Sequence, residues 1–124
     1  VNSNDGLDEI SPYDKTIVKQ LRNGEINEMT IDPKELNVNA EGFDKIVGND
    51  AKFNSKKIID IFKGNDDDFS KAVSLNAAAG LIISEREDNF KHAYEKARDH
   101  LLSGKTYLHL ENLRNAWKYI RENN

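Results

Sequence analysis

The hydrophobic and polar positions divide the chain into two parts with different periods. Between Thr16 and Ile31, apolar and polar residues alternate on either side of Asn23-Gly24. That dipeptide is typical of the tight turn between two antiparallel strands. From about residue 54 onward, apolar residues recur three and four positions apart, which is the spacing of a helix face. The pattern therefore predicts a β-hairpin followed by helices.

A turn at Asn23-Gly24 also fixes the register of the predicted hairpin. Each directly opposed pair contributes about 0.2–1 kcal/mol when its side chains are complementary. The register set by this turn gives two opposite-charge pairs and two apolar pairs: Arg22–Glu25, Lys19–Glu28, Leu21–Ile26 and Val18–Met29. Ile17 and Val18 are neighbours on one predicted strand, so their side chains point to opposite faces of the sheet. This indicates either a bulge or burial on both faces. Asp32-Pro33 ends the second strand, and residues 37–48 are predicted to form a connecting loop.

Four helices are predicted in the second part of the chain. The first lies near residues 54–63 and ends at Gly64, and the second begins in the acidic run Asp66-Asp67-Asp68. Apolar residues surround the axis of this second helix, so we expect residues 72–83 to be the most buried helical segment. The third helix runs from Phe90 to about Leu101. The fourth carries one apolar stripe, made of Leu110, Leu113, Trp117 and Ile120.

Composition narrows the class of protein. The chain has 124 residues, the length of one domain, with 22 acidic and 18 basic side chains and a net charge of −4. The absence of a basic block argues against a nucleic-acid-binding face. No apolar run is long enough to span a bilayer, so we expect no membrane association. There are no cysteines, which fits a reducing compartment, and we expect a cytoplasmic location.

Few residues outside the N-terminal region offer chemistry. His92 and His100 are separated by about 12 Å along one predicted helix, too far to share a metal ion. No nucleophile with an evident base and no glycine-rich phosphate loop is present in the sequence. Asn76 stands alone in an apolar helix and must find hydrogen-bond partners. We favour a role in tying the helix to a neighbouring loop backbone over a role in orienting a substrate-side loop.

The stretch DGLDEIS, from Asp5 to Ser11, is the strongest candidate site. Its adjacent carboxylates, Asp8 and Glu9, repel one another, and a cation would compensate that repulsion. Carboxylate oxygens suit Mg²⁺, which commonly uses one or two protein carboxylates together with substrate phosphates. The residues alone also fit an ordinary solvated acidic loop.

Several motifs together resemble the anthranilate phosphoribosyltransferase family. They are DGLDEIS, then RNGEINEMTIDP, then Gly48-Asn49-Asp50-Ala51, then LNAAAGLI from Leu75, and finally AYEKARDHLLSGK from Ala93. The resemblance covers nearly the whole chain in order and spacing. The sequence departs from the family at Pro12-Tyr13-Asp14, where many relatives carry Gly and Thr.

The resemblance implies a fold, a reaction and a metal site. The fold class would be α/β, the C-terminal portion of the nucleoside phosphorylase/phosphoribosyltransferase catalytic domain, which alone reads as α+β. The family transfers phosphoribosyl from phosphoribosyl pyrophosphate (PRPP) to anthranilate and releases pyrophosphate, a step of tryptophan biosynthesis. Asp8 and Glu9 match its Mg²⁺ ligands. The resemblance implies no catalytic or substrate-binding residue in this chain, because the family's other site residues lie upstream of Val1.

We therefore expect residues 1–124 to form a single partial domain. Residues 1–50 would hold the metal loop, the hairpin and the connecting loop, and residues 51–124 the helices. The missing N-terminal part of the same protein would supply the phosphate loop and the helices through which the family forms homodimers, and these 124 residues alone would be inactive. Two alternatives are a nucleic-acid-binding relative of the same fold and a stand-alone interaction module.

Overall fold

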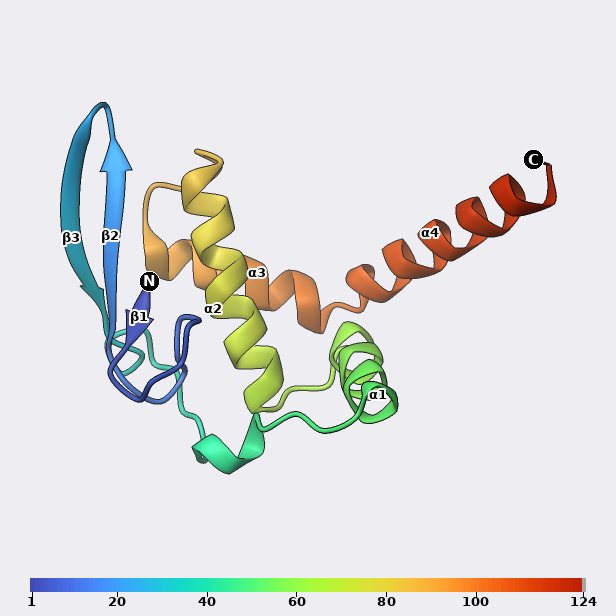
Figure 1. Ribbon diagram of the computed structural model, residues 1–124, viewed down its shortest axis with the longest axis horizontal. Coiled ribbons are helices and arrows are strands. Elements are labelled where there is room, and N and C mark those ends of the chain that lie inside the picture. The colour runs from blue at the N-terminus through green and yellow to red at the C-terminus, as the bar shows by residue number, and fades with distance from the viewer. Residues whose placement is uncertain (124) are drawn as a thin grey trace.

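The computed structural model describes residues 1–123, so Asn124, the last residue of the predicted domain, lies outside the described residues. Within this range the chain forms a small antiparallel sheet followed by helices, the α+β arrangement predicted from the sequence (Figure 1). The strands are β1 (Asn2–Ser3), β2 (Thr16–Arg22) and β3 (Glu25–Ile31). A short 3₁₀ helix (Phe43–Lys45) precedes α1 (Ala51–Phe62), α2 (Asp68–Ile83), α3 (Phe90–Leu102) and α4 (Lys105–Glu122).

The predicted hairpin is confirmed in position and register. All four predicted pairs are observed, within a ladder that runs unbroken from Thr16–Ile31 to Arg22–Glu25 without a bulge. Asn23 and Gly24 have φ values of 53° and 83°, the positive values that the predicted turn requires. One ion pair differs from the expectation. Lys19 lies 3.5 Å from Glu28, whereas Arg22 reaches across to Glu85, 3.6 Å away beyond the end of α2.

Acidic or amide side chains cap the starts of α1, α2 and α3. Asp50 accepts a hydrogen bond from the Phe53 N–H, which starts α1 three residues before the predicted position. Asp67 and Ser70 form a reciprocal capping box at the start of α2, so the acidic run serves as a helix start, as predicted. No helix among the described residues is long and apolar enough to cross a membrane.

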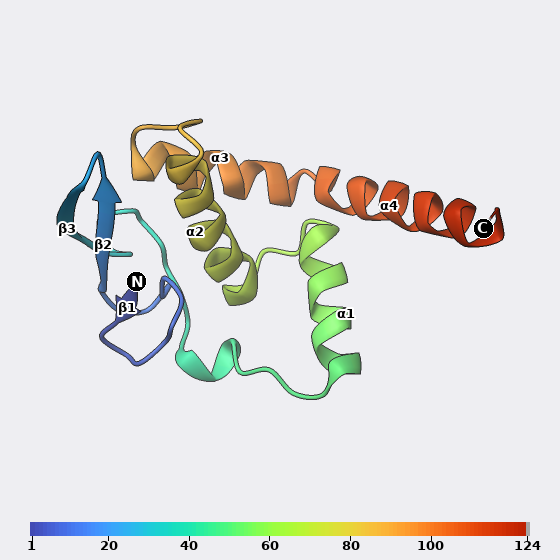
Figure 2. The same cartoon turned by 45° about the horizontal axis from the view of Figure 1, so that its top comes forward.

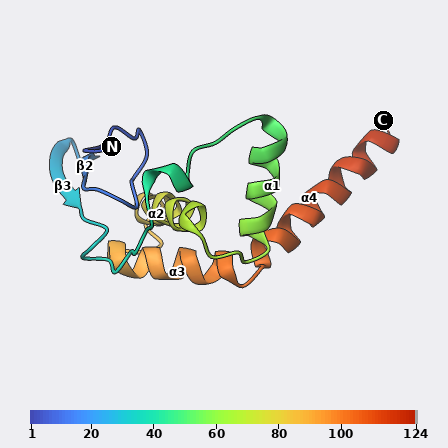
Figure 3. The same ribbon diagram turned by 90° about the horizontal axis from the view of Figure 1, so that it is seen from below.

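α2 is the central element of the fold, between the hairpin on one side and α1 on the other (Figure 3). It contributes more buried residues than any other described helix, but two of the five, Asp68 and Ser70, lie before the predicted segment 72–83. The predicted segment itself holds three buried residues, as many as α3, so it is not the most buried one by this measure. Its Leu75 and Ala78 are fully buried in a core that also includes Ile10 and Tyr94. However, α2 is not covered on most sides. Val73, Ala77, Gly80 and Ile83 form an exposed apolar stripe along it, and Ile83 is 75% exposed.

α4 leaves the body of the molecule and projects beyond α1 and α3 (Figure 2). Near its start Lys63 lies over the Tyr107 ring, 4.8 Å from the ring centroid. Further along, most of the predicted apolar stripe is open to solvent, with Trp117 66% exposed. The amphipathic pattern therefore identified the helix correctly, although Leu113 and Trp117 on its apolar face remain largely exposed.

The close approach of α1 and α3 generates a stability prediction. Gly64 ends α1 at φ 99°, and a Cβ there would lie 2.6 Å from the Leu102 carbonyl oxygen. Gly64→Ala should therefore lower the free energy of unfolding by about 2 kcal/mol or more, measured by urea denaturation.

Gly80→Ala is the matched control. Gly80 lies inside α2, and a Cβ added there would have no other heavy atom within 4 Å, so the change should stabilise the chain by about 0.5–1 kcal/mol. Equal effects of the two substitutions would contradict the helix packing described above.

Candidate functional site

The acidic loop connects β1 to β2 and displays two carboxylates to solvent. Asp8 and Glu9 are both exposed. Among residues 1–123, neither carboxylate has a hydrogen-bond or ion-pair partner in the structure. The two predicted metal ligands are therefore adjacent in the sequence, exposed and without a partner among the described residues.

Asp5, the third carboxylate of the stretch, has a different role. It accepts hydrogen bonds from the Ser11 hydroxyl and from the Leu7 N–H, 3.2 Å away. Partial burial raises the pKa of Asp5, but the hydrogen bonds from Ser11, Ser3 and Leu7 outweigh that effect and hold the pKa below its usual value. Asp5 thus stabilises the loop through hydrogen bonds to other residues of the loop.

The C-terminal side of the loop is fixed by Ser11, which is fully buried. Its N–H donates to the Thr16 hydroxyl oxygen (3.1 Å), and its own hydroxyl oxygen accepts from the Tyr13 N–H (3.0 Å). The segment that departs from the family pattern is therefore folded back onto Ser11. Tyr13 continues this connection by donating its hydroxyl to the Asp68 carboxylate, 3.2 Å away on α2.

Asp68 was predicted only as part of a helix start, and its second role was missed. Its buried carboxylate also accepts from the N–H groups of Glu41 (2.7 Å) and Gly42 (3.3 Å) and pairs with Lys71 (2.8 Å). Burial raises the pKa of Asp68, but the hydrogen bonds and the Lys71 charge outweigh it and lower the pKa. Apart from Lys71 on the same helix, its partners lie 26 to 55 positions away, so no local sequence signal indicated them.

Asn76 joins α2 to the acidic loop. Its Oδ1 accepts from the Ile10 N–H at 3.0 Å, and its Nδ2 donates to the Ile10 carbonyl oxygen at 3.1 Å. The favoured interpretation, a tie between the helix and a loop backbone, is confirmed. Ile10, the loop residue that Asn76 binds, directly follows Glu9 in the sequence.

The residues present fit a partial Mg²⁺ ligand set. Two exposed carboxylates supply hard oxygen donors in a loop that is fixed on both sides. Among the described residues, no group of three or more His, Cys, Asp or Glu side chains is arranged to hold a metal ion. Two carboxylates are the number that Mg²⁺ commonly takes from a protein when substrate phosphates complete its coordination.

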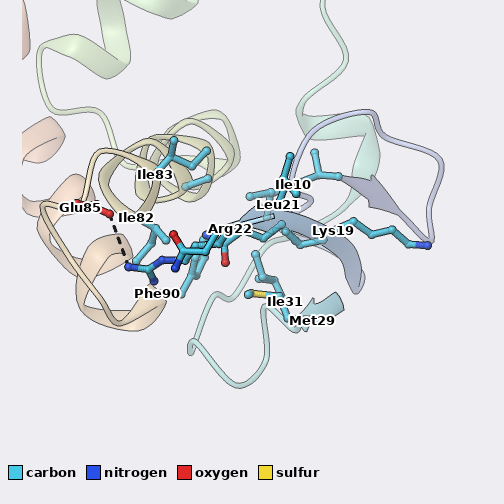
Figure 4. Close-up of a pocket in the computed structure, with 15 residues that line it drawn as sticks. Ile10, Lys19, Leu21, Arg22, Met29, Ile31, Ile82, Ile83, Glu85 and Phe90 are labelled. Carbon is cyan, nitrogen blue, oxygen red and sulfur yellow. Dashed lines mark ion pairs between the residues drawn. The ribbon is translucent and has the colours of Figure 1, made fainter. Parts of the chain in front are cut away.

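A cavity of about 590 Å³ lies between the hairpin and the end of α2, and its lining includes neither of these two carboxylates. Figure 4 shows apolar side chains such as Ile31, Ile82 and Phe90 around it, with the Arg22–Glu85 pair at its edge. Ile10 connects the cavity to the acidic loop because its side chain also lines the cavity. The lining offers no acidic pair comparable to Asp8-Glu9.

Removal of the Ser11 hydroxyl tests this description of the loop. Because the native pKa of Asp5 is depressed, its carboxylate stabilises the fold above the pKa of the unfolded chain, and this contribution is lost as pH falls through the native pKa. Ser11→Ala should raise the Asp5 pKa, read from the carboxyl carbon by NMR. The substitution should also lower the free energy of unfolding by about 1–3 kcal/mol at pH 7 and by less at acid pH.

Ser55→Ala is the control, since this hydroxyl bonds only to a carbonyl oxygen inside α1. An unchanged Asp5 titration in Ser11→Ala would show that Asp5 does not brace the loop.

The sequence of the chain is similar to a known protein family and to several known proteins. Residues 1–107 match a family model described as the glycosyl transferase family, a/b domain. The chain is 62% identical over 116 residues, 94% of its length, to the anthranilate phosphoribosyltransferase of Pelagibacter ubique. Proteins of the same name from Idiomarina loihiensis and Clostridium kluyveri are 34% and 32% identical over 90% and 93% of the chain.

The chain spans about a third of the length of these relatives: 35%, 33% and 34%, respectively. The family match, in contrast, extends over most of the described chain and includes the acidic loop, the hairpin and the first three helices. The chain therefore belongs to the glycosyl transferase family, a/b domain.

Proposed function

We propose that the chain forms the C-terminal part of the catalytic domain of a Mg²⁺-dependent phosphoribosyltransferase. The complete enzyme transfers phosphoribosyl from PRPP to anthranilate and releases pyrophosphate. The 62% identity with the Pelagibacter ubique protein carries this proposal. The exposed, uncommitted Asp8-Glu9 pair supports it, because it lies within the residues that match the family.

The surface of the chain supports the view that further protein covers it. The accessible surface is 8651 Å², whereas a compact monomer of 14.1 kDa exposes about 6,700 Å². If the excess, roughly 1,900 Å² on this chain, were covered by a partner that buries a similar area, the total of about 3,800 Å² would fall in the range of large permanent interfaces. Much of the exposed surface is apolar: the stripe on α2, the hairpin tip at Leu21 and Ile26, and the far part of α4. Such a surface fits a chain that completes its layers against the upstream part of the same protein.

The roles of the chain's own residues follow from the loop geometry. Asp8 and Glu9 would hold Mg²⁺ by their carboxylates, while Asp5 and Ser11 keep the loop backbone in place. When bound, Mg²⁺ would neutralise the negative charge that develops on the departing pyrophosphate. Little proton transfer is needed in this substitution, so alignment and charge compensation are the main requirements. The upstream part would supply the remaining phosphate and anthranilate contacts.

The two alternative functions are not favoured. The curated relatives described above carry a transferase name, and the net charge of −4 does not suit a phosphate-backbone surface. A stand-alone module would leave the apolar stripes on α2 and α4 without a covering partner. We further propose a cytoplasmic location and a homodimeric complete enzyme, through helices upstream of this chain.

The carboxylate pair provides the test of the proposed function. In the complete protein, Asp8→Asn with Glu9→Gln keeps the loop's shape but removes two charges. Turnover, followed by the loss of anthranilate fluorescence, should fall about 10²-fold or more, and the Mg²⁺ requirement should rise. The KM for anthranilate should change little, because its contacts are upstream.

The matched control is Glu25→Gln with Glu28→Gln, which removes two exposed charges from β3. It should leave turnover and the Mg²⁺ requirement unchanged. PRPP-dependent anthranilate consumption that is equal in the Asp8/Glu9 double variant and the parent protein would refute the metal role.

A further inference from the structure

A single side chain on α2 satisfies both main-chain groups of Ile10. The Asn76 amide accepts from the Ile10 N–H (3.0 Å) and donates to the Ile10 carbonyl oxygen (3.1 Å). Its second N–H donates to the Ala72 carbonyl oxygen, 2.9 Å away within α2, so the amide plane is itself fixed. The Ile10 side chain, only 1% exposed, is buried in the core beside Leu75 and Ala78.

The residue before the acidic pair is anchored as well. The Leu7 N–H donates to Asp5 Oδ1 (3.2 Å), and the Leu7 carbonyl oxygen accepts from the Ser3 N–H (3.1 Å). Asp8 and Glu9 are thus the two residues between a pair of backbone anchors, Leu7 and Ile10. Their backbone is held while their carboxylates remain exposed and uncommitted.

Asparagine suits this task better than similar side chains. Pairing with both the N–H and the carbonyl of one residue needs an acceptor and a donor on one planar group. Aspartate offers no donor to the carbonyl, serine cannot span both groups, and leucine leaves both unpaired. A buried backbone group without a partner is unfavourable, so loss of the amide should release Ile10 rather than leave it in place.

We propose that Asn76 is a positioning residue that holds Asp8 and Glu9 in the arrangement that binds a divalent cation. This inference rests on the proposed function, since it assumes that the carboxylate pair binds the metal. Asn76 acts through the Ile10 backbone and touches neither carboxylate. With the loop backbone held, less ordering is needed before the two carboxylates bind a cation, so the amide raises the affinity for the metal.

The experiment uses the complete protein and Mn²⁺ as the probe, with inorganic pyrophosphate at saturation. Mn²⁺ affinity is measured by electron paramagnetic resonance, and exchange of the Ile10 amide hydrogen is measured in parallel. The variants are Asn76→Leu and Asn76→Ser, the latter in case the apolar substitution prevents folding. Ile61→Val in α1 is the control, because it perturbs a buried side chain, 2% exposed, on a helix that lies on the other side of α2 from the loop (Figure 3).

Both Asn76 variants should bind Mn²⁺ about 10-fold or more weakly, within the range typical for residues that orient metal ligands. The Ile10 amide should exchange at least about 10-fold faster, because its acceptor is lost. Ile61→Val should keep the parent Mn²⁺ affinity, and the KM for anthranilate should be unchanged in every variant.

Two results would overturn the inference and are distinguishable from each other. If the Asn76 variants bind Mn²⁺ normally while the Asp8→Asn, Glu9→Gln protein does not, the positioning role is wrong and the proposed function stands. If the Asp8/Glu9 double variant itself binds Mn²⁺ like the parent, the metal role is wrong and the positioning role falls with it.

Discussion

The attachment of the acidic loop to α2 at Ile10 is the contact on which the arrangement of the chain depends. The Ile10 side chain enters the core between the sheet and α2, and Asn76 pairs with its backbone. One residue therefore joins the two parts of the chain, the strands and the helices, across 66 positions of sequence. Because Glu9 directly precedes it, the same contact that builds the core also determines where the carboxylate pair lies. The stability of the fold and the position of the candidate metal ligands therefore both depend on the contact between Ile10 and α2.

The small core has a structural consequence. Nine buried apolar side chains form the core of the described chain, and most lie around α2 and α3. A domain usually covers its sheet and its helices with a second layer on each apolar face. Here the sheet has three strands, of which β1 has only two residues, and α4 extends into solvent (Figure 1). The exposed apolar faces agree with a chain whose relatives are about three times as long.

Local signals predicted most of the secondary structure. Asn23-Gly24 fixed the turn and the complete hairpin register, and the acidic run before Phe69 marked the start of α2. Contacts between distant segments could not be predicted. The salt bridge of Arg22 with Glu85 needs the hairpin tip to lie beside the end of α2, and the distant partners of Asp68 come from two loops. Likewise, the sequence showed that Asn76 needs partners, but only the fold identifies Ile10 and connects it to the predicted metal pair.

The most direct test of the account is a chimera in which this chain replaces the matching third of the Pelagibacter ubique enzyme. If the chain completes a phosphoribosyltransferase domain, its apolar faces should pack against the upstream part of that enzyme, because the chain is 62% identical to the segment that it replaces. The account predicts PRPP- and Mg²⁺-dependent consumption of anthranilate within about 10-fold of the parent rate, a barrier change of about 1.4 kcal/mol. The 124 residues alone should show none. A folded chimera without this activity would contradict the account.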